Sequence, residues 1–464
     1  MGIFGGVQVI SILCSIIRTK LVAMWIGPAG VGLFALYNSA TDMIGNISGL
    51  GIRNSSVRDI SIESETCSRE RIATILSVVR RWSLFLGLAG AIIIISIAPI
   101  LSKITFGDDK HIWGFVALSV TLLINALANG EYAILQGTAR LRRLAHSTTW
   151  GVAIGVILSA PLFYYFKIDS IIPALIIYSV SCGASAWFFR NKDFSSDKKN
   201  LTAKDTFNIG KGFIKLGIFM TCSDIITQIT FYGFVAYLNH NGGTDIVGYY
   251  QTGYTLINKY AALILSALGV EYYPRLAKVS GSVIKTNMFV TKEINIALTF
   301  LVPIVSLFIV CRELIINILF TPQFLIISQY ISFAIIGTLI RAVSWCMAFV
   351  ILARGNGKLF LMAEIISTIA FIILYIPCYQ RWGITGFGYA FIGWYLIYAI
   401  FVAYIYFNKF NLSLKSSCLK WLIWGLAISS ATLFFMEINS LFGAIICSIL
   451  AVAVSCFSFK RFIL

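Results

Sequence analysis

The sequence predicts an all-α polytopic membrane protein with about fourteen transmembrane helices. Of its 464 residues, 58% are hydrophobic and only 12% are charged, and the mean hydropathy is +0.87. No soluble core could bury that much apolar surface. Apolar stretches of about 20 residues recur from end to end, each long enough at about 1.5 Å per residue to cross a hydrocarbon layer about 30 Å thick as a helix.

The apolar runs also predict the organisation of the chain. The polar segment 190–211 is the expected cytoplasmic linker between an N-terminal six-helix lobe, residues 1–189, and a C-terminal six-helix lobe, residues 212–407. Residues 408–464 supply two additional helices and a short tail. The fourteen predicted spans cover 5–26, 30–53, 82–105, 112–138, 148–166, 171–189, 212–237, 246–270, 288–311, 326–352, 359–380, 384–407, 419–436 and 440–459.

An internal repeat supports the division into lobes. The segment "GPAGVGLF" at 27–34 and the segment "GTDIVGYY" at 243–250 share two glycines and a valine at a constant offset of 216 residues. Each segment joins the first and second helices of its lobe. Six helices return each lobe to the side on which it began, so the repeat is expected to be parallel, as in other two-lobed transporters.

The net charge of +17 is spread over short loops and forms no single basic patch, so no nucleic-acid partner is expected. Of the 36 Lys and Arg residues, 25 fall in the loops of one side and the tail, five in the opposite loops, and six in or at the ends of spans. The positive-inside rule therefore places both termini in the cytoplasm.

Motifs of catalysis and metal binding are missing from the sequence. It contains no GxxxxGK[ST], HExxH or GxSxG motif, its ten cysteines form no CxxC pair, and its three histidines form no ligand set. We therefore expect a transporter with no cofactor and no metal site, and not an enzyme. Energy, if required, comes from an H⁺ or Na⁺ gradient, the membrane potential or removal of product, and the sequence does not choose among them.

The charges inside predicted spans are the most informative residues. Helix 1 should leave the membrane near Gly27, which puts Arg18 about 13 Å and Lys20 about 10 Å below that surface. A charge at such depth costs about 2.5–3.5 kcal/mol, so it normally faces protein or a water-filled cavity. Asp42 lies near the level of Arg18 and is its expected ion-pair partner.

The second lobe carries Asp224, Lys259 and Arg341 near mid-membrane. The central layer of the membrane then contains four cationic side chains and two carboxylates, and this surplus of positive charge favours an anionic substrate. The alternative is that the charged residues brace neighbouring helices. Six amide side chains in the spans also have two interpretations. They can form hydrogen bonds with sugar hydroxyls, or they can join transmembrane helices by hydrogen bonds. These residues are Asn125, Asn129, Gln136, Gln228, Gln251 and Asn258.

Two segments carry a family resemblance. "RTKLVAMWIGPAGVGLFALYNSATDMIGNISGLGIRNSSVRDIS" at 18–61 resembles the opening of the Wzx-type polysaccharide flippases of the multidrug/oligosaccharidyl-lipid/polysaccharide (MOP) superfamily. "VGYYQTGYTLINKYAALILSALGVEYYPRLA" at 247–277 is similar to their eighth helix. The resemblance implies two six-helix lobes around a central cavity, two extra C-terminal helices, and transport by alternating access.

The resemblance also implies a substrate. The family moves an undecaprenyl-pyrophosphate-linked oligosaccharide from the cytoplasmic to the periplasmic leaflet of the bacterial inner membrane, next to membrane lipid and, as candidate partners, a polysaccharide polymerase and chain-length machinery. Pyrophosphate-binding candidates are Arg18, Lys20, Arg53, Lys259 and Arg341. Asp42 and Asp224 are candidate charge partners or coupling sites, and Asn125, Asn129, Gln251 and Asn258 are candidate sugar contacts.

The related lipid II flippases place arginines in their first helix and at the end of the second. Arg18 and Arg53 match those positions approximately, whereas Met24 stands where that subgroup tends to have another arginine, which disfavours lipid II itself. Two rival functions are kept. One is a multidrug exporter of the same superfamily, which would bind organic cations, and the other is a membrane polymerase or ligase acting on the same lipid-linked sugars.

Overall fold

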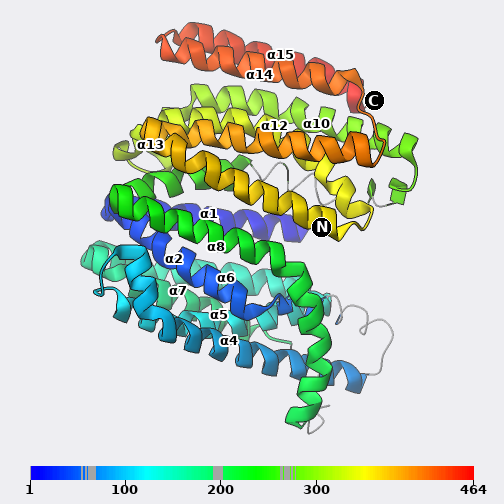
Figure 1. The fold of residues 1–464 in the computed structure, drawn as a ribbon. Coiled ribbons are helices and arrows are strands. Elements are labelled where there is room, and N and C mark those ends of the chain that lie inside the picture. The colour runs from blue at the N-terminus through cyan, green and yellow to red at the C-terminus, as the bar shows by residue number, and fades with distance from the viewer. Residues whose placement is uncertain are drawn as a thin grey trace. The chain divides into compact units, whose positions relative to one another are not determined.

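The computed structural model describes residues 2–53, 56–57, 60, 69–191, 202–261, 265, 272, 275–276 and 278–463. The part of the chain so described is built from helices and short connections and contains no β-strand (Figure 1). It divides into two compact units, Met1–Gly248 and Tyr249–Leu464. The lobe and linker boundaries expected from the sequence stay a prediction.

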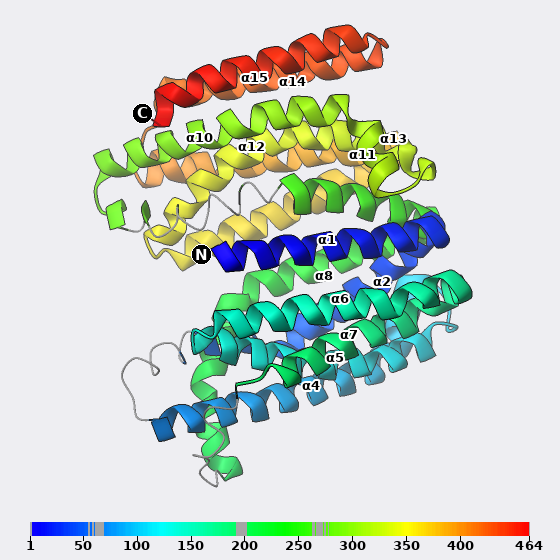
Figure 2. The same cartoon turned by 180° about the vertical axis from the view of Figure 1, so that it is seen from behind.

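Unit 1 is a bundle in which consecutive helices are mostly neighbours. Contacts join α4 to α5, α6 to α7, α5 to α7, α1 to α6 and α2 to α4. Figure 2 shows α6 and α7 side by side over much of their length. The helices are α1 (Gly2–Trp25), α2 (Gly27–Gly49), α4 (Arg69–Phe106), α5 (Ile112–Gly137), α6 (Leu141–Phe166), the 3₁₀ turn η1 (Lys167–Ser170), α7 (Ile171–Phe188) and most of α8 (Ala203–Thr255).

Unit 2 contains the end of α8 and the remaining helices. Helix α12 packs against α13, and the pair α14 and α15 packs against α10. The elements are the π-helical turn η2 (Leu256–Ala261), α10 (Val283–Val310), α11 (Arg312–Leu319), η3 (Pro322–Ile327), α12 (Ser328–Ala353), α13 (Gly357–Tyr404), η4 (Ile405–Lys409), α14 (Ser416–Glu437) and α15 (Leu441–Ile463).

The fourteen predicted spans all overlap helices. Two pairs of spans overlap the long helices α8 and α13, which are broken at Gly243 (φ 78°) and Gly383 (φ 58°). A positive φ suits glycine, so each kink lies at a residue that adopts this conformation without strain. Eight helical runs in the described residues are long and apolar enough to cross a membrane. The chain is a multi-pass, all-helical membrane protein.

Helix α4 differs from its prediction. Hydropathy predicts a third span that begins at residue 82, whereas the helix begins at Arg69. Its 38 residues extend about 57 Å, nearly twice the thickness of the hydrocarbon layer. Near the point where the extension meets the span, the Trp82 indole donates to the Thr206 carbonyl (3.0 Å) and Arg81 donates to the Thr206 hydroxyl (2.9 Å). The start of α8 is thereby attached to α4.

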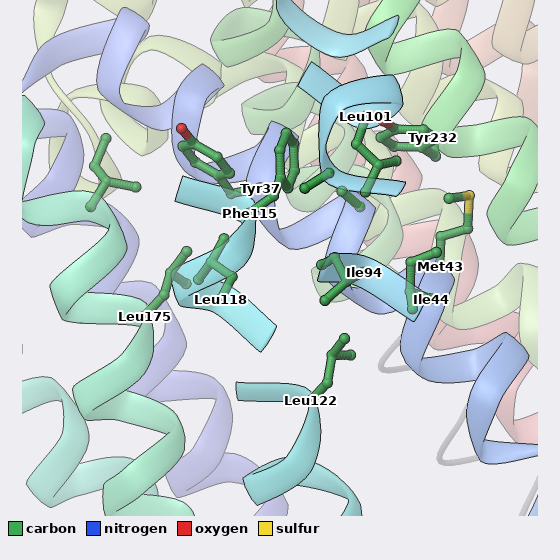
Figure 3. Close-up of a cluster of buried hydrophobic side chains, with 13 residues drawn as sticks. Tyr37, Met43, Ile44, Ile94, Leu101, Phe115, Leu118, Leu122, Leu175 and Tyr232 are labelled. Carbon is green, nitrogen blue, oxygen red and sulfur yellow. The ribbon is translucent and has the colours of Figure 1, made fainter. Parts of the chain in front are cut away.

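A buried apolar cluster holds α2, α4, α5, α7 and α8 together (Figure 3). At one end of it the Tyr37 ring packs against Phe115, with centroids 5.2 Å apart, and neither side chain is more than 2% exposed. Helices in lipid associate largely through such close packing, because the surrounding lipid tails are as apolar as the side chains themselves.

The same cluster ends in a polar contact at the loop before α5. The Tyr37 hydroxyl lies 2.8 Å from Nδ1 of His111, and the imidazole stacks on Phe106 with a centroid distance of 3.7 Å. The Asp108 carboxylate lies 4.0 Å from Nε2. Partial burial lowers the pKa of His111, and the nearby Asp108 opposes this shift.

The start of α2 crosses the last turns of α8 in unit 1 at a pair of glycines. A Cβ on Gly32 would lie 1.8 Å from the Thr244 carbonyl oxygen, and a Cβ on Gly248 would lie 2.1 Å from the Pro28 carbonyl oxygen. The two contacts are reciprocal, and their partners stand at the 216-residue offset of the sequence repeat. Only glycine lets the two backbones approach this closely.

Candidate functional site

A cavity of about 810 Å³ lies within unit 1. This volume is near the upper end of the range typical of small-molecule sites. Helices α2, α4, α5, α6, α7 and α8 all contribute to its walls. Its lining residues are Thr41, Asp42, Gly45, Asn46, Ser48, Gly49, Gly51, Ile52, Arg53, Ser83, Leu86, Leu122, Asn125, Ala126, Ala128, Asn129, Tyr132, Gln136, Thr148, Val152, Tyr178, Cys182 and Asp224.

Helix α2 presents one polar face to the cavity. Asp42, Asn46 and Gly49 follow one another at spacings of four and three residues, which places them on the same side of a helix. The Asp42 and Asn46 side chains are exposed, whereas Met43 and Ile44 between them are buried in the apolar cluster. Helix α2 therefore has one polar side that faces the cavity and one apolar side that packs in the cluster.

Helix α5 presents the facing polar stripe. Asn125, Asn129, Tyr132 and Gln136 recur at spacings of four, three and four residues and so share one face over about 16 Å. The sequence analysis selected Asn125 and Asn129, and the structure places both in the cavity wall. Gln136 was noted with the other amides, and Tyr132 was missed, although its position in the same repeating pattern could have revealed it.

Arg53 lies shortly after the end of α2. Helix α2 ends at Gly49 because Leu50 (φ 45°) and Gly51 (φ 64°) adopt left-handed conformations. The Arg53 guanidinium donates to Oδ1 of Asn129 (3.2 Å) and lies 5.9 Å from the Tyr132 ring centroid. It is the one cationic side chain among the described residues that line the cavity.

Arg18 lies behind the cavity wall. Its guanidinium carbon is 4.2 Å from the ring centroid of Tyr178, which lines the cavity, and 5.0 Å from that of Phe34. Two aromatic rings are thus the described contacts of this cation, and the ion pair with Asp42 stays a prediction. Such cation–π contacts partly replace lost hydration.

The described cavity wall contains three of the predicted charged residues, and the surplus of cations expected across both lobes stays a prediction. Two carboxylates, Asp42 and Asp224, line it together with one guanidinium, Arg53. Lys20 is half-buried and does not belong to the described lining. The described wall of the cavity is rich in amides and hydroxyls.

Four other candidate residues belong to unit 2. The Arg341 guanidinium donates to Oδ1 of Asn258 (2.6 Å) and lies 5.3 Å from the Tyr395 ring centroid. Asn258 belongs to the π-helical turn η2, a type of distortion that often accompanies functional sites. Oε1 of Gln251 is buried and accepts no hydrogen bond from a described residue. The side chain of Lys259 lies outside the described residues.

One ion pair close to the cavity was missed. Arg80 of α4 donates two hydrogen bonds to the Glu131 carboxylate of α5, at 2.6 and 3.1 Å, and a third to the Asn191 carbonyl (3.1 Å). Hydropathy alone predicts Arg80 in a loop, because the predicted third span begins two residues later. This paired geometry fixes α4 to α5 beside the polar stripe.

No group of His, Cys, Asp and Glu that could hold a metal ion occurs among the described residues. The arrangement therefore offers hydrogen bonds, aromatic faces and fixed charges. These groups can bind a polar molecule.

Comparisons with known proteins agree with this architecture. A family model described as "Polysaccharide biosynthesis protein" matches residues 21–329. A structure of the lipid II flippase MurJ in an inward closed conformation aligns with a TM-score of 0.74 at 17% identity and covers 99% of both chains. A search of the curated proteins gives no match.

Two further structures show the same fold. An inward-facing multidrug resistance MATE family transporter of the MOP superfamily aligns with a TM-score of 0.58 at 16% identity, covering 91% of this chain and 95% of that one. A MOP superfamily transporter from Pyrococcus furiosus aligns with a TM-score of 0.60 at 16% identity, covering 92% and 95%. The chain has the MOP fold and, by the match over most of its length, belongs to the polysaccharide biosynthesis protein family.

Proposed function

We propose that this protein is a flippase that moves an undecaprenyl-pyrophosphate-linked oligosaccharide from the cytoplasmic to the periplasmic leaflet by alternating access. The observation that carries the proposal is the polar cavity of unit 1. Amides, carboxylates and one guanidinium line it in a chain that is otherwise mostly apolar. Polar side chains inside membrane helices are costly and mark substrate pathways.

Membership of a polysaccharide biosynthesis family supports a lipid-linked sugar as the cargo. In this proposal Arg18, Lys20, Arg53, Lys259 and Arg341 serve the pyrophosphate. Arg53 and Arg341 are the best supported, because each has an amide and an aromatic ring as its described partners. A guanidinium so held keeps further donors for an anionic oxygen.

The remaining candidates have other roles in the proposal. The side chains of Asn125, Asn129, Gln251 and Asn258 serve sugar hydroxyls. Asp42 and Asp224 serve as charge partners or as coupling groups for an ion gradient. The lipid tail stays in the bilayer during transit, and the protein works in the inner membrane with both termini in the cytoplasm.

The decisive experiment deletes the gene and locates the undecaprenyl-linked oligosaccharide with a probe applied to the periplasmic side of intact spheroplasts. We expect complete units to accumulate where the probe cannot reach them, and expression of the wild-type gene to restore access. Completed but unpolymerised units on the outer face would point to a polymerase or ligase instead.

The second candidate function is a multidrug exporter. The two carboxylates in the cavity wall favour it, because organic cations bind to acidic pockets. It predicts that the deletion strain becomes sensitive to cationic drugs and shows no change in lipid-linked sugars. The deletion strain thus distinguishes the two functions by two measurements, the location of the lipid-linked sugar and the sensitivity to cationic drugs.

A further inference from the structure

Three polar contacts hold the last turn of α4 to α8. The Tyr232 hydroxyl lies 2.6 Å from the Thr105 hydroxyl. The Asn239 amide donates to the Thr105 carbonyl (2.7 Å). Nε2 of His240 lies 2.6 Å from the Ile104 carbonyl oxygen and is the donor, because a carbonyl can only accept. All three contacts are at the C-terminal end of α4.

A few residues later α8 packs against α2. The break in α8 at Gly243 is followed at once by the close approach of Gly248 and its neighbours to Gly32 and its neighbours. Residues 232–248 of α8 therefore reach from the end of α4 to the start of α2, and we call this stretch the strap. Gly243, with φ 78°, is a non-helical point between the two attachments.

The buried apolar cluster lies between the strap and the cavity of unit 1. Tyr232 of the strap is itself a member of the cluster and is drawn with it in Figure 3. Leu122 belongs both to the cluster and to the lining of the cavity. Helix α2 has the same order, because Tyr37 is in the cluster and Thr41, one turn later, lines the cavity. The strap thus covers the packed end of the cavity within unit 1.

The two attachments of the strap differ in what can replace them. The contacts with α4 are hydrogen bonds, and the His240 side chain is exposed and Asn239 half-buried. Water can take over such hydrogen bonds, so each one has a small net effect on the equilibrium. The contact with α2 is close packing of glycine backbone, which water cannot replace. The attachment to α4 is therefore the one that can open and close.

We propose that the strap is a gate, and that breaking its three contacts with α4 lets it move off the apolar cluster and opens the cavity at this end of unit 1. The inference goes beyond the proposed function, because it holds for any polar molecule that the cavity binds. In the orientation expected from the sequence, this end faces the periplasm. Loss of one hydrogen bond should shift the ratio of open to closed molecules about fivefold.

The test measures how fast a cysteine in the cavity reacts with a membrane-impermeant maleimide. Thr41→Cys supplies the single cysteine of an otherwise cysteine-free, full-length protein in native membrane vesicles of both orientations. Lys110→Cys, exposed in the loop after α4, is the reference that shows which face of the membrane carries the strap. With the strap intact, we expect Thr41→Cys to react from that face at least about tenfold more slowly than Lys110→Cys.

Variants of the strap then open the gate. Tyr232→Phe removes only the hydroxyl and keeps the ring in the cluster, and Asn239→Ala removes one donor. Each should speed the labelling of Thr41→Cys from the face of the strap about fivefold, and the two together should speed it more. Asn241→Ala is the matched control, because its amide donates to the Tyr237 carbonyl of the same helix (2.8 Å), and it should leave the rate unchanged.

Unchanged labelling in both Tyr232→Phe and Asn239→Ala would overturn the gate. So would an equal rise in Asn241→Ala, or a rise of the same size from both faces of the membrane, because a general loosening of the fold exposes the cavity to both. None of these measurements uses a lipid-linked sugar. Failure of the gate is therefore distinct from failure of the proposed function.

Discussion

The close approach of α2 and α8 at Gly32 and Gly248 predicts that replacing Gly32 with alanine lowers the unfolding free energy. A Cβ at Gly32 would lie 1.8 Å from the Thr244 carbonyl oxygen, whereas real Cβ contacts are essentially never shorter than 3.0 Å. The obstacle is backbone and cannot rotate away. In Gly32→Ala the two helices must therefore separate by at least 1.2 Å at this point. Overpacking of this kind costs about 1–3 kcal/mol of unfolding free energy.

Gly233 provides the matched control. It lies in α8, is exposed, and would have no atom within 4 Å of an added Cβ. Alanine is the better helix former by about 1 kcal/mol, so Gly233→Ala should be neutral or stabilising. SDS titration of the purified protein in mixed micelles measures the difference in unfolding free energy between the two variants.

The reciprocal geometry adds a stricter test. Since Gly248 meets the Pro28 carbonyl in the same crossing, the separation forced by Gly32→Ala already makes room for Gly248→Ala. The double variant should lose clearly less free energy than the sum of the two single losses. Simple additivity, or a Gly32→Ala variant as stable as Gly233→Ala, would show that the helices do not cross here as described.

Three further changes test other contacts. Glu131→Gln leaves Arg80 without its carboxylate and should lower the unfolding free energy by about 1.5–3 kcal/mol in the same titration, whereas Asp109→Asn, in an exposed pair with Lys103, should change it little. Burial lowers the pKa of His111, so this residue takes up a proton more readily in the unfolded chain than in the folded protein. The unfolding free energy should therefore fall as the pH drops below about 6.5. Melting temperatures measured from pH 8 to pH 5 should show this fall for the wild type and a smaller one for His111→Gln. Arg341→Ala should reduce transport at least about tenfold at a normal protein level.

Each of these has an outcome that contradicts it. An unchanged titration in Glu131→Gln would mean that the ion pair does not hold α4 to α5. A melting temperature that rises as the pH falls, or the same slope in His111→Gln, would show that this histidine is not buried as its contacts indicate. Wild-type transport in Arg341→Ala would leave that residue a brace between helices.

Hydropathy and the position of charged residues along each helix predicted most of the membrane spans and several residues of the cavity. The spans were predictable because each must bury about 20 apolar residues in lipid, and polar residues inside spans, such as Asp42 and Asn125, were recognised as candidates that the structure places in the cavity wall. The partner of Arg18 was not predictable. Whether it meets Asp42 or the ring of Tyr178 depends on how α1 is rotated against its neighbours, and hydropathy does not encode rotation.

The early start of α4 had a signal that the span prediction did not use. Hydropathy detects only the part of a helix that lies in lipid, and residues 69–81 are rich in charge. Ile72, Leu76 and Val79 nevertheless recur at spacings of four and three residues, and all three are buried in one cluster. An amphipathic periodicity therefore marks the extension, as it does in soluble helices.

The length of α4 has a mechanical consequence. A helix of about 57 Å that is held by lipid over about 30 Å leaves an arm of about 27 Å, and a tilt of about ten degrees displaces the end of that arm by about 5 Å. The arm is tied to Thr206 near its base, so the same tilt pulls on the start of α8. If α4 tilts in this way, we expect a displacement large enough to be followed by a pair of probes at Arg69 and Thr206.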